Sequence, residues 1–209
     1  MKNYTDAELV NKAKEKILKE AEALKLVAGQ VDEAYAKTIK AILDCKGRLI
    51  ITGLGKTGHV SKKIAASFAS LGVPAFFVHS CESLHGDMGM ITKDDVVIMI
   101  SNSGKSQEIL NMLPPLKIIG AKTVSITKDK SSPLAKETDI AILVNPGEEI
   151  DHMGLAPTTS STGALAAGDA LAVIVSEIKE FKKENFALSH PGGALGQKLI
   201  KEYQSKING

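Results

Sequence analysis

Two segments of the chain carry far more hydroxyl groups than local structure requires. In the segment 101–106, four of the six residues are Ser or Asn, and the run 158–162 consists of five consecutive Thr and Ser residues. A helix N-cap needs only one such side chain. The excess predicts a site for an oxyanion with several oxygens, such as a phosphate. The hydroxyl groups expected to bind it are those of Ser101, Ser103, Ser106, Thr158, Thr159, Ser160, Ser161 and Thr162.

Carboxylates lie next to both segments and indicate acid–base chemistry. Glu108 follows the first segment, and Lys105 stands where a capping box would need Ser or Thr. The alternative is that Glu108 has no catalytic role and is simply favoured near a helix N-terminus by the helix dipole. Before the second segment, the like charges of Glu148, Glu149 and Asp151 would raise one another's pKa in a cleft, which suits proton transfer. For Glu148 and Asp151 we favour the alternative of a solvated acidic loop.

Two histidines lie beside glycines in predicted loops. His85 begins the sequence HGDMGM, and His190 precedes Pro-Gly-Gly, so His190 is either an exposed loop residue or a functional one. The remaining histidines are interpreted as structural or surface residues: His59, His79 and His152. Cys81 and His85 are four residues apart, but two ligands do not make a metal site. We therefore predict no required metal.

A glycine-rich turn, GLGKTG at 53–58, follows the first predicted strand. It fits the G-x-G-x-x-G pattern of dinucleotide-binding proteins, but the second strand ends in Val-His-Ser without the acidic residue those proteins need. A nucleotide-binding P-loop would require glycine at position 50, which is Ile50. The remaining interpretation is an anion site in which Lys56 and the backbone of Gly53, Gly55 and Thr57 face the ligand at a helix N-terminus. A tight turn with a solvated lysine is the alternative.

The elements that must position these residues are short strands alternating with helices. Apolar runs rich in β-branched residues or Phe predict strands at 49–52, 75–78, 96–100, 123–126 and 140–144. Helices are predicted at 60–71, 107–119 (interrupted by Pro114-Pro115), 133–136 and 162–181, with a terminal helix after a glycine-rich turn. Residues 1–45 are helical in character and break near Gly29. This alternation predicts a parallel sheet with helices on both faces and ligands at the carboxyl ends of the strands.

The composition is typical of a soluble globular protein. The 209 residues are 44% hydrophobic and 24% charged, with a net charge of +2. A single arginine, Arg48, and an aromatic content of 4% argue against nucleic-acid binding. No apolar stretch approaches twenty residues and no apolar leader begins the chain, so we expect neither a membrane span nor a signal peptide. Two cysteines fit a reducing compartment, which predicts a cytoplasmic protein.

Five sequence segments together resemble a known family. GLGKTGH, HGDMGM, ISNSGKSQE, GLAPTTSSTGALAAGDALA and FALSHPGGALGQKL occur in this order. They resemble sugar isomerase (SIS) domain proteins of the D-arabinose-5-phosphate isomerase type, over roughly residues 45 to 200. Leu54, Thr57 and Lys105 depart from the residues usual in that family. Many relatives continue into a pair of CBS modules, whereas this sequence stops soon after Lys198, so we expect one SIS domain over 1–209, with a helical segment at 1–45 and the sheet core and C-terminal helices at 46–209.

The resemblance implies both a fold and a set of functional positions. The fold is a three-layer α/β/α sandwich with a five-stranded parallel sheet, flavodoxin-like, usually assembled as a homotetramer with sites at subunit interfaces. The implied functional positions are Lys56, His85, Glu108, Glu149 and His190. The phosphate would be bound by the hydroxyl groups of the segments 101–106 and 158–162.

The implied reaction interconverts D-ribulose 5-phosphate and D-arabinose 5-phosphate, the first step toward 3-deoxy-D-manno-octulosonate (Kdo). A proton moves between C1 and C2 through an enediol or enediolate, which needs no cofactor. Glu149 leads as the proton-transfer residue with Glu108 as the second carboxylate, His190 assists ring opening or proton relay, and Lys56 and His85 orient the sugar oxygens. The alternatives are another SIS-type phosphosugar isomerase, a non-catalytic sugar-phosphate sensor and, less favoured, a nicotinamide dehydrogenase.

Overall fold

A five-stranded parallel sheet forms the centre of the protein. The computed structural model describes residues 3–207. The strands are β1 (Leu49–Gly53), β2 (Ala75–His79), β3 (Val96–Ile100), β4 (Lys122–Thr127) and β5 (Ile140–Leu143), in the spatial order β2-β1-β3-β4-β5. Every neighbouring pair is parallel. The predicted parallel sheet and the flavodoxin-like strand order are confirmed.

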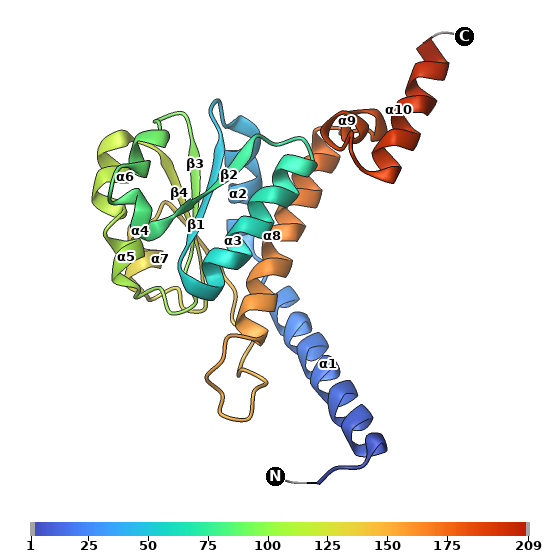
Figure 1. Ribbon diagram of the computed structural model, residues 1–209. Helices are drawn as coiled ribbons and strands as arrows, with labels where there is room; N and C mark the ends of the chain where they lie inside the picture. The colour runs from blue at the N-terminus through green and yellow to red at the C-terminus, as the bar shows by residue number, and fades with distance from the viewer. Residues whose placement is uncertain (1–2, 208–209) are drawn as a thin grey trace.

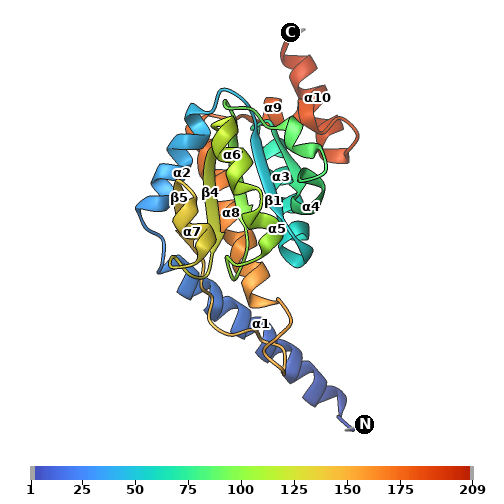
Figure 2. The same ribbon diagram turned by 90° about the vertical axis from the view of Figure 1, so that its left-hand side faces the viewer.

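Helices cover both faces of the sheet and make a three-layer sandwich (Figures 1 and 2). One layer contains α1 (Asp6–Ala28), α2 (Glu33–Asp44), α3 (Gly55–Ser70) and α8 (Thr159–Ile178). The other contains α4 (Ser80–Ser83), α5 (Gln107–Leu110), α6 (Leu113–Ile119) and α7 (Pro133–Glu137). A 3₁₀ turn, η1 (Asp87–Met90), follows α4, and α9 (Lys183–Ser189) and α10 (Ala194–Ile207) follow α8.

The core is split by the sheet into two apolar clusters, because successive strand residues point to opposite faces. On the α3/α8 side, Ile51 and Ile98 pack with Phe68 and Leu171. On the α5/α6 side, the alternate strand residues pack with the short helices, for example Met99 with Leu116. The expectation of strands buried on both faces holds fully for β1 and β3, whereas β2 and β5, at the edges of the sheet, are only partly buried.

Several helix boundaries differ from the sequence expectation. The region 107–119 breaks before the prolines, so that α6 begins at Leu113 with proline in its first turn, where the missing N–H costs nothing. The start of α1, by contrast, agrees with the sequence, in which Thr5 or Asp6 could cap the helix: Thr5 precedes α1, and its side chain forms a capping box with Glu8. The elements α4, η1 and α9 were not expected. They are short and carry little periodic signal.

Within residues 3–207, one helix has the length and hydropathy that a membrane span would need. It is α8, with 20 residues and a mean hydropathy of 1.3. Its inner face lies in the core, where Leu171 and Val175 are fully buried. A Cβ at Gly168 would lie 2.4 Å from Ile64 Cδ1 of α3, so glycine is what lets the two helices approach this closely. The apolar composition of α8 is therefore that of a core helix.

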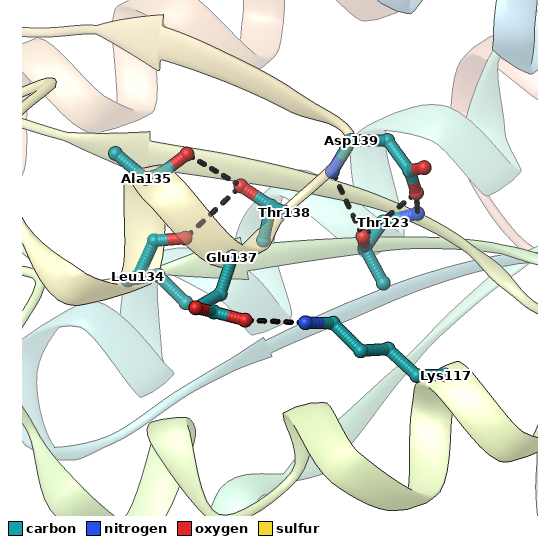
Figure 3. A network of polar contacts seen from close by, with 7 residues as sticks. All are labelled: Lys117, Thr123, Leu134, Ala135, Glu137, Thr138 and Asp139. Atoms are coloured by element: carbon teal, nitrogen blue, oxygen red, sulfur yellow. Dashed lines mark hydrogen bonds and ion pairs between the residues drawn. The ribbon is translucent and has the colours of Figure 1, made fainter.

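A network of polar contacts holds the edge strand β5 against β4 (Figure 3). The Asp139 carboxylate accepts hydrogen bonds from the Thr123 N–H and hydroxyl, each at 2.8 Å. Thr138 Oγ1 donates to the Leu134 carbonyl of α7 at 3.1 Å, and Lys117 of α6 pairs with Glu137 of α7. The network lies before β5, and the strand leads from it to the loop that carries Glu149.

Candidate active site

The loops at the carboxyl ends of the strands converge beside the switch point of the sheet. β1 is followed by α3 on one face, whereas β3 is followed by α5 on the other, and ligands of open α/β sheets bind where connections diverge in this way. A cavity of about 10 Å³ here is lined by Thr57 of the glycine turn, Asn102 of the loop after β3, Thr127 of β4 and Ser160 of α8, together with apolar side chains of the sheet and α8. Three of the segments singled out in the sequence therefore meet at one place.

The glycine turn after β1 is shaped by its backbone. A Cβ at Gly53 would lie 2.9 Å from the Thr57 carbonyl oxygen, and Gly55 has a φ of +58°. Thr57 Oγ1 donates to the Leu54 carbonyl at 2.8 Å and accepts from its N–H at 3.3 Å, so this hydroxyl closes the turn. Leu54, the residue before α3, offers no side-chain cap, and Lys56 is exposed in the first helical turn. The first turn of α3, at the carboxyl end of β1, therefore carries N–H groups without a side-chain cap and an exposed lysine, Lys56.

The loop 101–106 is held in a curved conformation by its own hydroxyl groups. Ser101 Oγ accepts from the Gly104 N–H and lies 3.2 Å from Ser106 Oγ, while Ser103 Oγ accepts from the Lys105 N–H. Gly104 has a φ of +62°, a conformation that favours glycine. Ser103 is exposed and Ser106 is half-buried, so both are accessible at the carboxyl end of β3.

Glu149 lies at the N-terminus of α8. Its Oε2 accepts hydrogen bonds from Thr158 N–H at 2.7 Å, Thr158 Oγ1 at 3.0 Å and Ser160 N–H at 3.2 Å. Burial favours the neutral carboxyl, but the hydrogen bonds from Ser160 and Thr158 outweigh it and lower the pKa of Glu149. The sequence expectation of a pKa raised by neighbouring carboxylates is wrong, because hydrogen-bond donors rather than like charges dominate this position.

Most of the hydroxyl run 158–162 binds the chain itself. Thr159 Oγ1 donates to the Glu148 carbonyl at 2.9 Å, and Thr158 Oγ1 accepts from the Ile150 N–H at 3.1 Å. Ser161 Oγ donates to the Thr158 carbonyl at 2.8 Å. The first two contacts therefore fix the Glu148 carbonyl and the Ile150 N–H, the backbone groups on either side of Glu149. The excess of hydroxyl groups that suggested an oxyanion thus also holds a carboxylate of the protein.

Asp151 organises the loop between Glu149 and α8. Its carboxylate accepts from the N–H groups of Met153 at 2.8 Å, Leu155 at 2.8 Å and Ala156 at 2.6 Å. These backbone hydrogen bonds, that of Met153 first, lower the pKa of Asp151. Asp151 therefore lies in an exposed acidic loop, as favoured from the sequence, and its carboxylate in addition orders the backbone of that loop. Aspartate followed by a turn containing glycine is a known loop signal, which could have identified it.

The two histidines lie in different parts of the chain. His85 is exposed in the turn between α4 and η1, beyond the carboxyl end of β2. His190 ends α9, where its Nδ1 lies 3.0 Å from the Phe186 carbonyl oxygen and its ring stacks on Phe186 at 3.8 Å. The 20 residues of α8, about 30 Å of helix, separate α9 from Glu149 (Figure 1). One chain therefore gathers Lys56, the loop 101–106 and Glu149 at one end and leaves His190 at the other.

Glu108 lies half-buried in the first turn of α5, directly after the loop 101–106. Within residues 3–207, no three His, Cys, Asp or Glu side chains lie close enough together to hold a metal ion. The donors that the site offers are hydroxyl groups, backbone N–H groups and the Lys56 ammonium, which suit an anionic ligand.

A model of the SIS domain matches residues 42–174. This range contains β1 to β5 and most of α8, with the glycine turn, the loop 101–106 and Glu149. The chain belongs to the SIS domain family. Its sheet order and three-layer architecture are those that the sequence resemblance implied.

Several known proteins are similar to this chain over most of the chain's own length. Arabinose 5-phosphate isomerase KdsD of Pseudomonas aeruginosa is 45% identical over 92% of this chain and 59% of that protein. Its counterpart from Yersinia pestis is 47% identical over 87% of this chain and 55% of that protein. The chain thus spans a little over half the length of these relatives. The structure of c3406 of Escherichia coli CFT073 in complex with arabinose 5-phosphate has 42% identity and a TM-score of 0.88, over 90% of this chain and all of that one.

Proposed function

We propose that this SIS domain catalyses the reversible isomerisation of D-ribulose 5-phosphate and D-arabinose 5-phosphate. The observation that carries the proposal is the Glu149 carboxylate, held at the N-terminus of α8 by the N–H groups of Thr158 and Ser160, since Ser160 also lines a cavity with Asn102 of the loop 101–106. A fixed, ionised carboxylate next to an anion-binding loop is what proton abstraction from a sugar phosphate requires. The names of the relatives and the sugar-phosphate complex of c3406 support the same activity.

The proposed mechanism moves one proton between C1 and C2 of the open-chain sugar. Glu149 takes the proton from one carbon and an enediolate forms, with its oxyanion stabilised by nearby donors. Returning the proton to the other carbon completes the reaction. Glu108 is the second carboxylate available for transfer between oxygens, and Lys56 and His85 orient the sugar oxygens. The reaction needs no redox cofactor, because the substrate is both oxidised and reduced.

The phosphate is assigned first to the loop 101–106 and the glycine turn. Ser103 and Ser106 are accessible there, whereas the hydroxyl groups of Thr158 and Thr159 are already bonded to the loop that carries Glu149. Ser160, Ser161 and Thr162 of the run 158–162 are assigned a secondary part in phosphate binding; Ser160 lines the cavity with Asn102, whereas Ser161 Oγ already donates to the Thr158 carbonyl. This arrangement separates phosphate binding from proton transfer.

The proposed enzyme is a homotetramer with its sites at subunit interfaces. His190 can join Glu149 only if another copy of the chain supplies it, since α8 separates the two within one chain. The first half of α1 extends away from the sheet and exposes Val10 at 67% and Ile17 at 70%, apolar surface that a neighbouring subunit would cover (Figure 1). We further propose that the chain acts as a single SIS domain in the cytoplasm and that its product enters Kdo synthesis for lipopolysaccharide or capsule.

A single reaction tests the proposal. The protein is incubated with ribulose 5-phosphate in EDTA, without nicotinamide cofactor, and the products are identified by NMR. Arabinose 5-phosphate is expected. If ribulose 5-phosphate is not converted, parallel incubations that convert a hexulose 6-phosphate or sedoheptulose 7-phosphate would identify another SIS-type isomerase, and binding of a sugar phosphate without turnover would identify a sensor. Activity that disappears in EDTA and returns with a divalent ion would refute the metal-free mechanism.

A further inference from the structure

The loop that carries Glu149 is held at its start by a residue outside the recognised motifs, Gln30. This residue lies in the turn between α1 and α2. Its Nε2 donates to the Asn145 carbonyl at 2.6 Å, and its Oε1 accepts from the Asn145 N–H at 2.8 Å. One amide side chain therefore pairs with both backbone polar groups of a single residue, as a neighbouring strand would.

The position of Asn145 gives this pairing a directional role. The Val144 N–H still donates to the Thr127 carbonyl of β4 at 2.9 Å, so the backbone groups of the next residue point to the open edge of the sheet. Gln30 pairs them there. Pro146 follows and has no N–H with which to continue a ladder. The chain leaves the sheet at this point, four residues before Glu149.

Apolar packing also fixes this junction, the point at Asn145 and Pro146 where the chain leaves the sheet. Val27, in the last turn of α1, is 5% exposed, and Pro146 is buried. A Cβ at Gly163 of α8 would lie 3.3 Å from Val27 Cγ2 and 3.6 Å from Pro146 Cβ, so a glycine lets α8 close on the junction. Nearer the N-terminus of α1, Lys16 Nζ donates to the Ile150 carbonyl at 3.0 Å. The N-terminal segment therefore contacts the loop both before and after Glu149.

We propose that Gln30 is a positioning residue for Glu149: its pairing with Asn145 fixes where the loop leaves β5 and so keeps the Glu149 carboxylate at the start of α8. Gln30 lies outside residues 42–174, the range that the SIS model matches. The N-terminal segment is thereby part of the architecture of the site. The effect on turnover rests on the proposed function, whereas the effect on the loop does not.

The test variant is Gln30→Met, which keeps the length of the side chain and removes both hydrogen bonds. Asn145 is exposed, so water replaces the lost partners and the fold is retained. The first measurement needs no substrate: the amide proton chemical shifts of Thr158 and Ser160, which donate to Glu149. Glu149→Gln serves as the reference, because it weakens the hydrogen bonds that the Thr158 and Ser160 N–H groups donate to residue 149. Gln30→Met is expected to move both amide resonances in the same direction as Glu149→Gln does. Val31→Ala, an exposed neighbour, is the control.

The second measurement is turnover of ribulose 5-phosphate. In Gln30→Met we expect kcat to fall roughly 10- to 100-fold, the scale of a small displacement of a reacting group. KM should stay within about twofold, because the phosphate-binding loop is braced by β4 and α7 rather than by Gln30. Unchanged amide shifts of Thr158 and Ser160 in Gln30→Met would overturn the proposal. If the wild type converts the sugar, shifted amides together with an unchanged kcat in Gln30→Met would also overturn it. Shifted amides in a protein whose wild type does not convert the sugar support the positioning and refute the proposed function.

Discussion

Substituting Glu149 by glutamine removes a proton acceptor while preserving most of the local structure. Three hydrogen bonds end on Oε2 of the carboxylate, and all three are donated to it. The amide oxygen of glutamine can take the place of Oε2 and accept the same three bonds. Glu149→Gln should therefore fold with the side chain still at the start of α8.

The expected losses in stability and turnover differ in size and origin. Hydrogen bonds to a charged acceptor are worth about 1.5–3 kcal/mol and neutral ones about 0.5–1.5 kcal/mol. Because the bonds share one partly exposed acceptor, they are not additive, and we expect the variant to lose about 1–2 kcal/mol of unfolding free energy. A positioned acid–base group contributes about 10²- to 10⁴-fold to kcat, or about 2.7–5.4 kcal/mol of barrier. Turnover should thus fall much further than stability.

The assay measures kcat and KM on ribulose 5-phosphate together with exchange of the C1 and C2 protons with deuterated water. In Glu149→Gln, kcat and exchange should fall in parallel while KM changes little, since the proposed phosphate site is the loop 101–106 rather than Glu149. Glu148→Gln is the matched control, because Glu148 is the exposed neighbouring carboxylate. Near-normal turnover and exchange in Glu149→Gln would refute the assignment, and Glu108 would then be the residue to test.

The other predictions concern binding, pH, assembly and ring opening. Ser103→Ala should raise KM by removing roughly 1–3 kcal/mol of interaction with the phosphate, and an unchanged KM would contradict the loop assignment. Because hydrogen bonds lower the pKa of Glu149, the base stays ionised, and kcat should fall only as the pH drops through that lowered value; an acidic limb above the ordinary glutamate range would contradict this. Light scattering should give a tetramer, and an active monomer would exclude shared sites. His190→Asn should slow initial rates more from cyclic arabinose 5-phosphate than from ribulose 5-phosphate, and equal losses would exclude a role in ring opening.

The sheet and its loops could be predicted because their signals are local. Each strand is a short β-branched run with turn residues behind it, and parallel topology then requires the loops to meet at one edge. Gly53 and Gly55 were expected in a tight turn, and the structure gives each a backbone reason: a close approach to Thr57 at Gly53 and a positive φ at Gly55. These features depend on residues near one another in the chain.

The chemistry of the loops depended on long-range pairing and was harder to predict. A cluster of three carboxylates suggests mutual repulsion, yet Glu149 and Asp151 each bind several donors, and both have lowered pKa values. The contact between Gln30 and Asn145 spans 115 residues and leaves no periodic signal. No sequence spacing indicates that a turn residue near position 30 completes the edge of a sheet more than a hundred residues later.

For His190, the sequence and the structure supply different parts of the argument. The sequence singles it out because a histidine before Pro-Gly-Gly has no place in a regular element, but it cannot say what the side chain faces. The structure places it on α9, stacked on Phe186, beyond the end of a helix about 30 Å long. If His190 takes part in the reaction, the site must be built from more than one copy of the chain. The distance between Glu149 and His190 within one chain therefore leads to a prediction about assembly. Mixing the two impaired variants, Glu149→Gln and His190→Asn, should form some sites that contain both native residues, and the rate from arabinose 5-phosphate should rise above that of either variant alone.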